Sequence, residues 1–415
     1  MTLSKKSLLG FVFVFITPFV GLLISFNSTS YKKNKLSMLS ISLFTASFIW
    51  FVPPYQDLYR RFYETYFVYN DNLGLLQAIY GHVDFLFYLM AYFFKINNIP
   101  FFIIPVIAAS TSVYLFLTSL SIIFERSRLE IESSRLKVAY FIAFCFVNII
   151  VIALGIRFGW AAAISVYGVI ALIFEKKYLK GYSILIIATT LHFSMILIIM
   201  AVVFSRFFRV KRSKLVIFCI IIISFSNLIL PIVISHITIF GIDHYAQNGY
   251  VDGKFAAVDT TLNSLIVAGW RYVLAVFMIY FYCKGNKNPE KELKDFENFI
   301  FIYICISCCT FMSYIAFNRY ITEIGLQLYV LLFLSSIGVY KKLVLNAILI
   351  LSIMNLLFNN IYLQRRPIAL GEMWRGVYTP LILRYNYSEQ DFERYLTKID
   401  SAGDWIGHEL KSNQQ

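Results

Sequence analysis

Residues 101–124 read FFIIPVIAASTSVYLFLTSLSIIF, a run of about 24 residues without one charged side chain. An α-helix rises about 1.5 Å per residue, so this run is long enough to cross the ~30 Å hydrocarbon core of a bilayer. Similar runs recur along the 415-residue chain, in which 59% of the residues are hydrophobic and 14% are charged. A soluble protein needs about 25% charged residues, so the composition excludes a soluble globular enzyme. The sequence predicts an all-α, polytopic membrane protein.

About ten helices are expected to cross the membrane, and two further segments are not. Residues 82–95 are too short to span and predict an amphipathic helix in the outer interface. Residues 182–204 have basic loops on both sides, so they either form a re-entrant pair of half-helices, which we favour, or cross the membrane. The ten predicted spans are 8–26, 36–52, 101–124, 138–155, 158–174, 215–235, 263–283, 296–316, 320–338 and 343–360.

The 37 lysines and arginines exceed the 23 acidic residues, and most of the surplus lies in short loops. Basic loops of this kind face the cytoplasm and anionic lipid, so we expect membrane lipid as a partner and no nucleic acid. The loops are Lys32, Lys33 and Lys35; Arg126, Arg128, Arg135 and Lys137; Lys176, Lys177 and Lys180; Arg206, Arg209, Lys211, Arg212 and Lys214; Lys284, Lys287, Lys291 and Lys294; and Lys341 and Lys342.

With these loops inside, both termini are predicted to lie outside the cytoplasm. We expect one transmembrane domain over 1–360, with outer loops at about 53–100 and 236–262, and a polar C-terminal tail over 361–415. The cytoplasmic loops are short, so the chemistry is expected at the outer face.

Three arginines near outer helix ends are candidate ligands for an anionic group. Arg157 lies in ALGIRFGWAAAI, Arg319 in FNRYITEI and Arg271 in VAGWRYVLAVF. An ionisable residue inside a span costs about 2.5–3.5 kcal/mol on insertion scales, so it calls for a role. Each arginine either anchors its helix to lipid headgroups or binds a phosphate through its planar guanidinium.

His192, in TLHFSMIL, is a histidine inside an apolar segment. It is either a hydrogen-bonded helix-contact residue or a site residue that acts as a base or as a donor to a sugar hydroxyl or phosphate. The sequence leaves both open.

The outer loop opens with PPYQDLYRRFYETY at residues 53–66. Read as a helix, it is either an interfacial element with a tyrosine belt and ion pairs, or a platform for a sugar beside a carboxylate base. His82 and Asp84 are secondary candidates of the same kind. The candidate residues of this stretch are Asp57, Tyr59, Arg60, Arg61, Tyr63 and Glu64.

The order of these motifs resembles the EpsG-like polymerases of bacterial surface polysaccharides, which have the same role as Wzy-type O-antigen and capsule polymerases. The resemblance is carried by DLYRRFYETY, DFLFYLMAYFFK, IRFGWAAAI, EKKYLKGYSILIIATTLHFSMILI and NRYITEIGLQLY, and it covers most of the chain.

The resemblance implies a metal-independent, cofactor-free glycosyltransferase of GT-C-like build in the bacterial inner membrane, working at the periplasmic face. Its substrate would be an undecaprenyl-diphosphate-linked oligosaccharide, and a chain-length regulator protein is a candidate partner. We expect Arg157 and Arg319 to bind diphosphate, with Arg271 in support, and Asp57 or His192 to act on the acceptor hydroxyl.

Two other classes remain as alternatives. A lipid-linked oligosaccharide flippase should show more regular spans and internal repeats, whereas this chain concentrates polar residues in outer segments. A membrane O-acyltransferase would use a histidine such as His192.

Overall fold

The helices of the computed structural model account for nearly all of the residues that it describes, which are 5–30, 35–69, 73–126, 131–235, 261–286, 289–363, 368, 371–386 and 388–399. Within them, six helical segments are long and apolar enough to cross a membrane. The all-α prediction is confirmed, and these helices indicate a multi-pass membrane protein. The six segments are Ile103–Arg126, Ser133–Leu154, Ile156–Ile173, Arg212–Ile229, Leu262–Gly285 and Lys342–Leu363.

Six of the ten predicted spans coincide with these segments, and the other four are built from shorter pieces. Residues 36–52 become the 15-residue helix α3 (Lys35–Ile49). Residues 296–316 and 320–338 become α16 (Lys291–Cys308), α17 (Tyr314–Asn318), the π-helix η6 (Arg319–Ile324) and α18 (Gly325–Leu334). The predicted outer loop 236–262 lies almost entirely outside the described residues.

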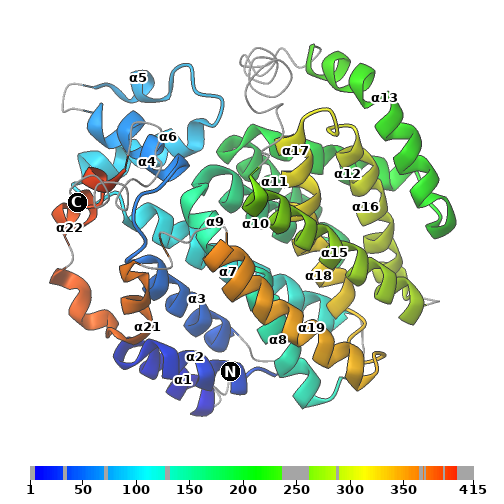
Figure 1. Ribbon diagram of the computed structural model, residues 1–415, viewed down its shortest axis with the longest axis horizontal. Helices are drawn as coiled ribbons and strands as arrows, with labels where there is room; N and C mark the ends of the chain where they lie inside the picture. Colours follow the sequence, from blue (N-terminus) through cyan, green and yellow to red (C-terminus); the bar gives the residue numbers. More distant parts are fainter. Residues whose placement is uncertain are drawn as a thin grey trace. The chain divides into compact units, whose positions relative to one another are not determined.

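Two compact units make up the chain, and Figure 1 shows their helices. Unit 1 comprises residues 1–118, 147–160 and 356–415, and unit 2 comprises residues 119–146 and 161–355. The predicted division into 1–360 and 361–415 stays a prediction.

The first predicted span, 8–26, is wrong because it folds as two short helices with a break between them. Pro18 begins the second helix, and its ring disfavours helical backbone at Thr17, which has φ −139° and ψ 88°. The arms, α1 (Lys5–Ile16) and α2 (Pro18–Asn27), have 12 and 10 residues. At about 18 and 15 Å they are too short to cross a bilayer.

These two arms run antiparallel in close contact. A Cβ atom on Gly21 would lie 2.4 Å from the backbone nitrogen of Val14. At the open end, the Ser37 hydroxyl at the start of α3 lies 3.1 Å from the Ser7 hydroxyl and 2.8 Å from that of Ser28. Both ends of the hairpin therefore meet the start of α3. The prediction that the chain begins across the membrane from Lys35 is wrong, because the break at Thr17–Pro18 returns the chain to the end from which α1 starts.

Unit 2 contains a second hairpin of this kind, at residues 178–207. α11 (Tyr178–Leu191) ends where His192 adopts extended backbone, with φ −152° and ψ 114°. The 3-10 turn η2 (Phe193–Met195) then leads into α12 (Ile196–Phe207). The guanidinium carbon of Arg206 lies 5.0 Å from the ring centre of Tyr178, so the end of α12 returns to the start of α11. This is the pair of half-helices that the re-entrant alternative predicts, and His192 stands at its turn.

Basic loops of unit 2 converge on one end of that unit. Lys176 Nζ lies 2.9 Å from Glu292 Oε1, and Arg212 Nε lies 2.6 Å from Glu297 Oε1. Arg135 Nη1 donates to the Gly338 carbonyl oxygen at 2.8 Å. Loops far apart in sequence are thus joined at this end, as the assignment of all of them to one membrane side requires.

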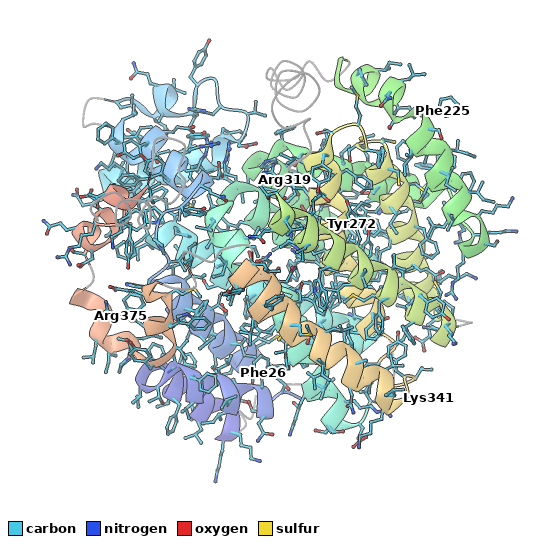
Figure 2. All side chains as sticks on the ribbon, in the orientation of Figure 1. Phe26, Phe225, Tyr272, Arg319, Lys341 and Arg375 are labelled. Carbon is cyan, nitrogen blue, oxygen red and sulfur yellow. The ribbon has the colours of Figure 1, made fainter. Side chains whose placement is uncertain are left out.

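One helix of unit 2 presents an almost bare apolar surface. Only 6% of the residues in the span Arg212–Ile229 are buried. Phe225, on α13 (Leu215–Ser235), is 53% exposed, and Figure 2 shows it at the rim of unit 2. Such a surface suits contact with lipid chains.

In unit 1, α3 leads from Lys35 to the elements that carry the predicted sugar platform. These are α4 (Asp57–Phe62), the π-helix η1 (Tyr63–Phe67), α5 (Leu75–Ile79) and α6 (Phe85–Ile96). With 12 residues, α6 is about 18 Å long and too short to span, as predicted. Figure 1 shows α4, α5 and α6 gathered at the end of unit 1 remote from α1 and α2.

Candidate functional site

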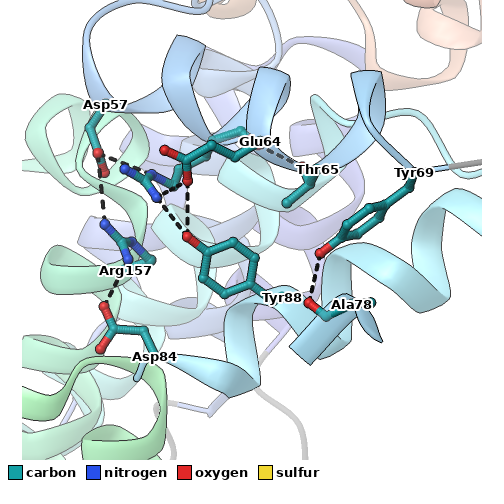
Figure 3. A network of polar contacts seen from close by, with 9 residues as sticks. Asp57, Glu64, Thr65, Tyr69, Ala78, Asp84, Tyr88 and Arg157 are labelled. Carbon is teal, nitrogen blue, oxygen red and sulfur yellow. Dashed lines mark hydrogen bonds and ion pairs between the residues drawn. The ribbon is translucent and has the colours of Figure 1, made fainter. Parts of the chain in front are cut away.

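Arg61 is the centre of a charged network in unit 1, shown in Figure 3. Its Nε lies 3.2 Å from Asp57 Oδ1, and its Nη1 contacts Glu64 Oε2 and lies 2.7 Å from the Tyr88 hydroxyl. Tyr88 in turn donates to Glu64 Oε2 at 2.9 Å. The spacing of Asp57, Arg61 and Glu64 places all three on one helical face, so the local sequence builds this half of the network.

Arg157 joins the same network from the start of α10 (Ile156–Ile173). Its Nη1 lies 2.9 Å from Asp84 Oδ2, and its Nη2 lies 3.9 Å from Asp57 Oδ1. The Asp84 side chain is only 3% exposed, and that of Arg157 is 12% exposed. A buried carboxylate therefore neutralises Arg157, and the network, named here the charged cluster, holds two arginines against three carboxylates.

Two carboxylates, Asp57 and Glu64, are the most exposed side chains of the charged cluster. The side chains of Asp57 and Glu64 are 36% and 43% exposed, whereas that of Arg61 is 11% exposed. The buried Arg61 and the largely buried Arg157 thus orient a carboxylate that solvent or a substrate can reach. Such a group is suited to accept a proton from a hydroxyl.

Burial shifts the pKa of two side chains beside the carboxylates of the cluster, Tyr88 and His82. Burial raises the pKa of Tyr88 to about 12, with Glu64 adding to the rise and Arg157 and Arg61 opposing it, so the phenol stays a hydrogen-bond donor. Burial lowers the pKa of His82, whose ring stacks on Tyr88 with centroids 3.5 Å apart. His82 is therefore held neutral.

An aromatic surface adjoins the cluster, as the sugar-platform interpretation requires. The Tyr59 and Tyr63 rings lie 4.8 Å apart, and Tyr63 and Phe67 lie 5.0 Å apart. Phe67 is 72% exposed. Arg60 lies on the same short helix and is partly exposed. Partly exposed rings of this kind are suited to stacking on apolar sugar faces.

The second candidate region is the His192 turn of unit 2. The His192 ring is 4% exposed, and its Nδ1 lies 2.7 Å from the Ser194 hydroxyl and 3.4 Å from the Ser194 backbone nitrogen. A backbone N–H can only donate, so Nδ1 accepts and the neutral ring carries its proton on Nε2. In this tautomer His192 is a donor through Nε2.

Tyrosines connect the His192 turn to the helix that carries Arg319. Tyr320 donates through its hydroxyl to the Ser194 carbonyl at 2.9 Å, and Tyr303 donates to the Tyr320 carbonyl at 2.7 Å. Arg319, labelled in Figure 2, precedes Tyr320 in η6. Its side chain is partly buried. The structure thus joins the elements that carry two of the predicted site residues, His192 and Arg319.

Arg271, on α15 (Leu262–Gly285), is the most buried of the three candidate arginines, with a side chain 6% exposed. Its Nη1 lies 3.8 Å from Glu323 Oε1 of η6. The neighbouring Tyr272 donates its hydroxyl hydrogen to Asn318 Oδ1 at 2.5 Å. Sequence reasoning missed Glu323, since an acid in NRYITEI is unremarkable until its helix packs against α15.

The structure therefore divides the predicted site residues into two groups. Unit 1 holds the predicted residues of 53–66 and Arg157, and unit 2 holds His192, Arg271 and Arg319. Asp84, a secondary candidate, is a buried partner of Arg157. Tyr88 was missed, because a tyrosine on an apolar helix gives no signal until that helix meets Arg61 and Glu64. Within the described residues, no group of three or more His, Cys, Asp and Glu side chains is placed to hold a metal ion.

Both groups include a π-helical turn, a geometry that is rare and frequent at functional sites. Glu64 lies in η1, and Arg319 and Glu323 lie in η6.

Comparison with known proteins identifies one family. A family model described as the EpsG family matches residues 53–369, which is most of the chain and includes every predicted site residue. No curated protein and no solved structure matches the chain.

Proposed function

Because the chain belongs to the EpsG family, which is associated with exopolysaccharide biosynthesis, we propose that it is the polymerase of a surface polysaccharide. It would transfer a growing glycan from its undecaprenyl diphosphate onto the terminal sugar of an incoming lipid-linked repeat unit. The GT-C-like build and the position in the bacterial inner membrane are parts of this proposal.

The observation that carries the proposal is the partly exposed carboxylate of Asp57, held by Arg61 and close to Arg157. In the reaction, the acceptor hydroxyl oxygen attacks the anomeric carbon of the donor, and the bond from that carbon to the diphosphate breaks. Asp57 takes the hydroxyl proton, and the diphosphate leaves with the bonding electrons. The tyrosines Tyr59 and Tyr63 would stack on the acceptor sugar.

Departure of a diphosphate requires stabilisation of negative charge, which arginine can supply. We propose Arg157, Arg319 and Arg271 as candidates, each to be tested alone. Arg157 would have a second function besides binding the diphosphate. Its guanidinium is held by Asp84 and lies close to Asp57, so it also orients the Asp57 carboxylate. Activity is expected to persist after chelation of divalent cations.

The membrane orientation of each unit follows from its own basic end. We propose that the basic end of unit 2 and the Lys35 end of unit 1 face the cytoplasm. The charged cluster follows the opposite end of α3, so it would face the periplasm. Reporter fusions after Lys137, Lys180, Lys214 and Lys294 should all report cytoplasm, and so should a fusion before Lys5.

The decisive experiment is reconstitution of the purified chain with a lipid-linked repeat unit. A polymerase yields a ladder of lengthening glycans on the lipid. In cells that lack the protein, the surface should carry single repeat units. Loss of a flippase would leave almost none on the surface, so either a bare surface or the absence of a ladder contradicts the proposal.

A membrane O-acyltransferase is the second candidate, favoured by one observation. His192 is buried at the turn of a helical hairpin and bonded to the Ser194 hydroxyl. Loss of such an enzyme would leave polymer of normal length that lacks an ester, which chemical analysis of the polysaccharide distinguishes.

A further inference from the structure

The residue that precedes Asp57 has an unusual backbone. Gln56 caps α4 with φ 54° and ψ −120°, a region that residues with a Cβ rarely adopt. Its carbonyl accepts the first helical hydrogen bond, from the Arg60 nitrogen at 3.2 Å. A conformation of this kind persists only where the surrounding structure enforces it.

On the N-terminal side of Gln56, a C-terminal segment of the chain contacts the end of α3 and Phe51. The Ser47 hydroxyl donates to the Gly376 carbonyl at 2.5 Å, and a Cβ atom on Gly376 would lie 2.4 Å from the Ser47 carbonyl oxygen. The preceding residue in that segment, Arg375, lies over the Phe51 ring at 4.9 Å. Residues 371–386 and 388–399 are named here the C-terminal strap. Through Trp374 and Gly376 the strap lies directly on the end of α3.

A second contact lies on the C-terminal side. Phe392 is fully buried, and its ring centre lies 5.7 Å from that of Phe62, the last residue of α4. It also lies 6.0 Å from Phe101 and 6.3 Å from Phe102. Figure 1 shows α22 (Glu389–Glu393), which carries Phe392, next to α4.

We propose that the C-terminal strap is a positioning element that holds the strained Gln56 backbone and thereby aims the Asp57 carboxylate at Arg61 and Arg157. The strap lies outside the residues that the family model matches, 53–369. The catalytic meaning of this positioning rests on the proposed function. The effect of the strap on the backbone of Gln56 does not depend on the proposed function.

The test asks whether the effect of removing the Phe392 contact depends on the residue at position 56. Phe392→Ala is combined with Gln56→Gly, which accepts positive φ without strain, and with Gln56→Ala, which does not. We expect Phe392→Ala to slow polymerisation at least about tenfold with glutamine or alanine at position 56, and by about threefold or less with glycine there. The loss should appear in kcat more than in KM, because the aim of the base changes rather than binding.

A second readout needs no activity. Hydrogen exchange of the amides in residues 57–67, measured on the full chain in lipid nanodiscs, should rise about tenfold in Phe392→Ala and in Gly376→Ala. Phe392→Leu, which keeps an apolar side chain, should restore protection. Phe296→Ala, an equally buried ring in unit 2, is the matched control and should leave these amides unchanged.

The outcomes separate the two proposals. Equal cost of Phe392→Ala in all three backgrounds would overturn the positioning role and leave Phe392 as ordinary packing. Unchanged exchange in 57–67 would overturn it as well. Altered exchange in a chain that forms no polymer would retain the strap and reject the polymerase.

Discussion

The buried polar groups of the charged cluster in unit 1 and of the His192 turn in unit 2 are paired in different ways. The cluster opposes formal charges at short distances, with Arg157 2.9 Å from Asp84. The His192 turn relies on hydrogen bonds between neutral groups, and the ion pair of Arg271 with Glu323 in the same unit is 3.8 Å long. Formal charge close to an exposed carboxylate suits proton transfer, whereas neutral donors suit binding and orientation. We therefore expect the two regions to respond differently to substitution.

The largest effect should come from the exposed carboxylate of the cluster. Asp57→Asn keeps the size of the side chain but removes its basicity, so polymerisation by the purified protein should slow by about 10²–10⁴-fold. Asp295→Asn is the control, because Asp295 is an exposed carboxylate in unit 2. A loss of less than about threefold in Asp57→Asn would move the base to another residue.

Arg157 should give the next largest effect, and it tests whether geometry or charge alone matters. Lysine keeps the charge but loses the planar fork between Asp84 and Asp57, so Arg157→Lys should slow the reaction roughly ten- to hundredfold. Arg157→Ala should be worse at equal membrane abundance, because it leaves Asp84 buried without this charge. Polymer length on a gel is the measurement, with Arg209→Lys, an exposed arginine, as control. Full-length polymer from both Arg157 variants would return this residue to a headgroup anchor.

In the His192 turn, the rate of polymerisation should depend on the hydrogen-bond donor of His192 and not on its basicity. His192→Gln can still donate near the Nε2 position and should retain activity to within about threefold, whereas His192→Leu should lose roughly tenfold. The measurement is the initial rate of polymerisation across pH. If both variants are inactive and the wild-type rate follows titration of one histidine, the assignment of the base to Asp57 fails.

The α1–α2 hairpin of unit 1 extends the comparison to the stability of the fold. Gly21→Ala introduces a Cβ atom into the backbone of α1 and should destabilise the protein by about 1–3 kcal/mol. Gly269→Ala is the matched control, because a Cβ atom there would meet nothing within 4 Å. It should be neutral or slightly stabilising, since alanine favours helix. Thermal unfolding in detergent compares the two, and equal melting temperatures would contradict the tight α1–α2 contact.

The smallest expected effect is a pH dependence of unit 1. Burial lowers the pKa of His82 in the folded protein below its ordinary value of 6.5. The folded state then favours neutral His82, so this contribution to stability is present above about pH 6.5 and is lost as the pH falls through the lowered pKa. His82→Phe keeps the stack on Tyr88 without a titrating group. Thermal unfolding between about pH 7.5 and 5 should therefore show a shallower acid-side slope in that variant.

Comparison of the two hairpins shows which local signals were sufficient. Residues 182–204 were expected to form a re-entrant pair because basic loops flank both ends and a histidine interrupts the apolar run. Residues 8–26 carry an equivalent signal in Lys5 and Lys6 on one side and Lys32 and Lys33 on the other. The decisive break at Thr17–Pro18 was hidden because total hydrophobicity and length alone match a single span.

The sequence by itself determined the membrane class, six of the spans, the gathering of the basic loops of unit 2 at one end and the helical face that joins Asp57, Arg61 and Glu64. These depend on hydropathy, charge and helical periodicity, which are local properties. Only the tertiary structure decided that Arg157 pairs with Asp84, 73 positions away, that Glu323 approaches Arg271, and that Phe392 supports Phe62. Those pairings depend on which helix surfaces pack together. A buried charge needs a partner of opposite charge, but neither segment by itself specifies which residue that partner is.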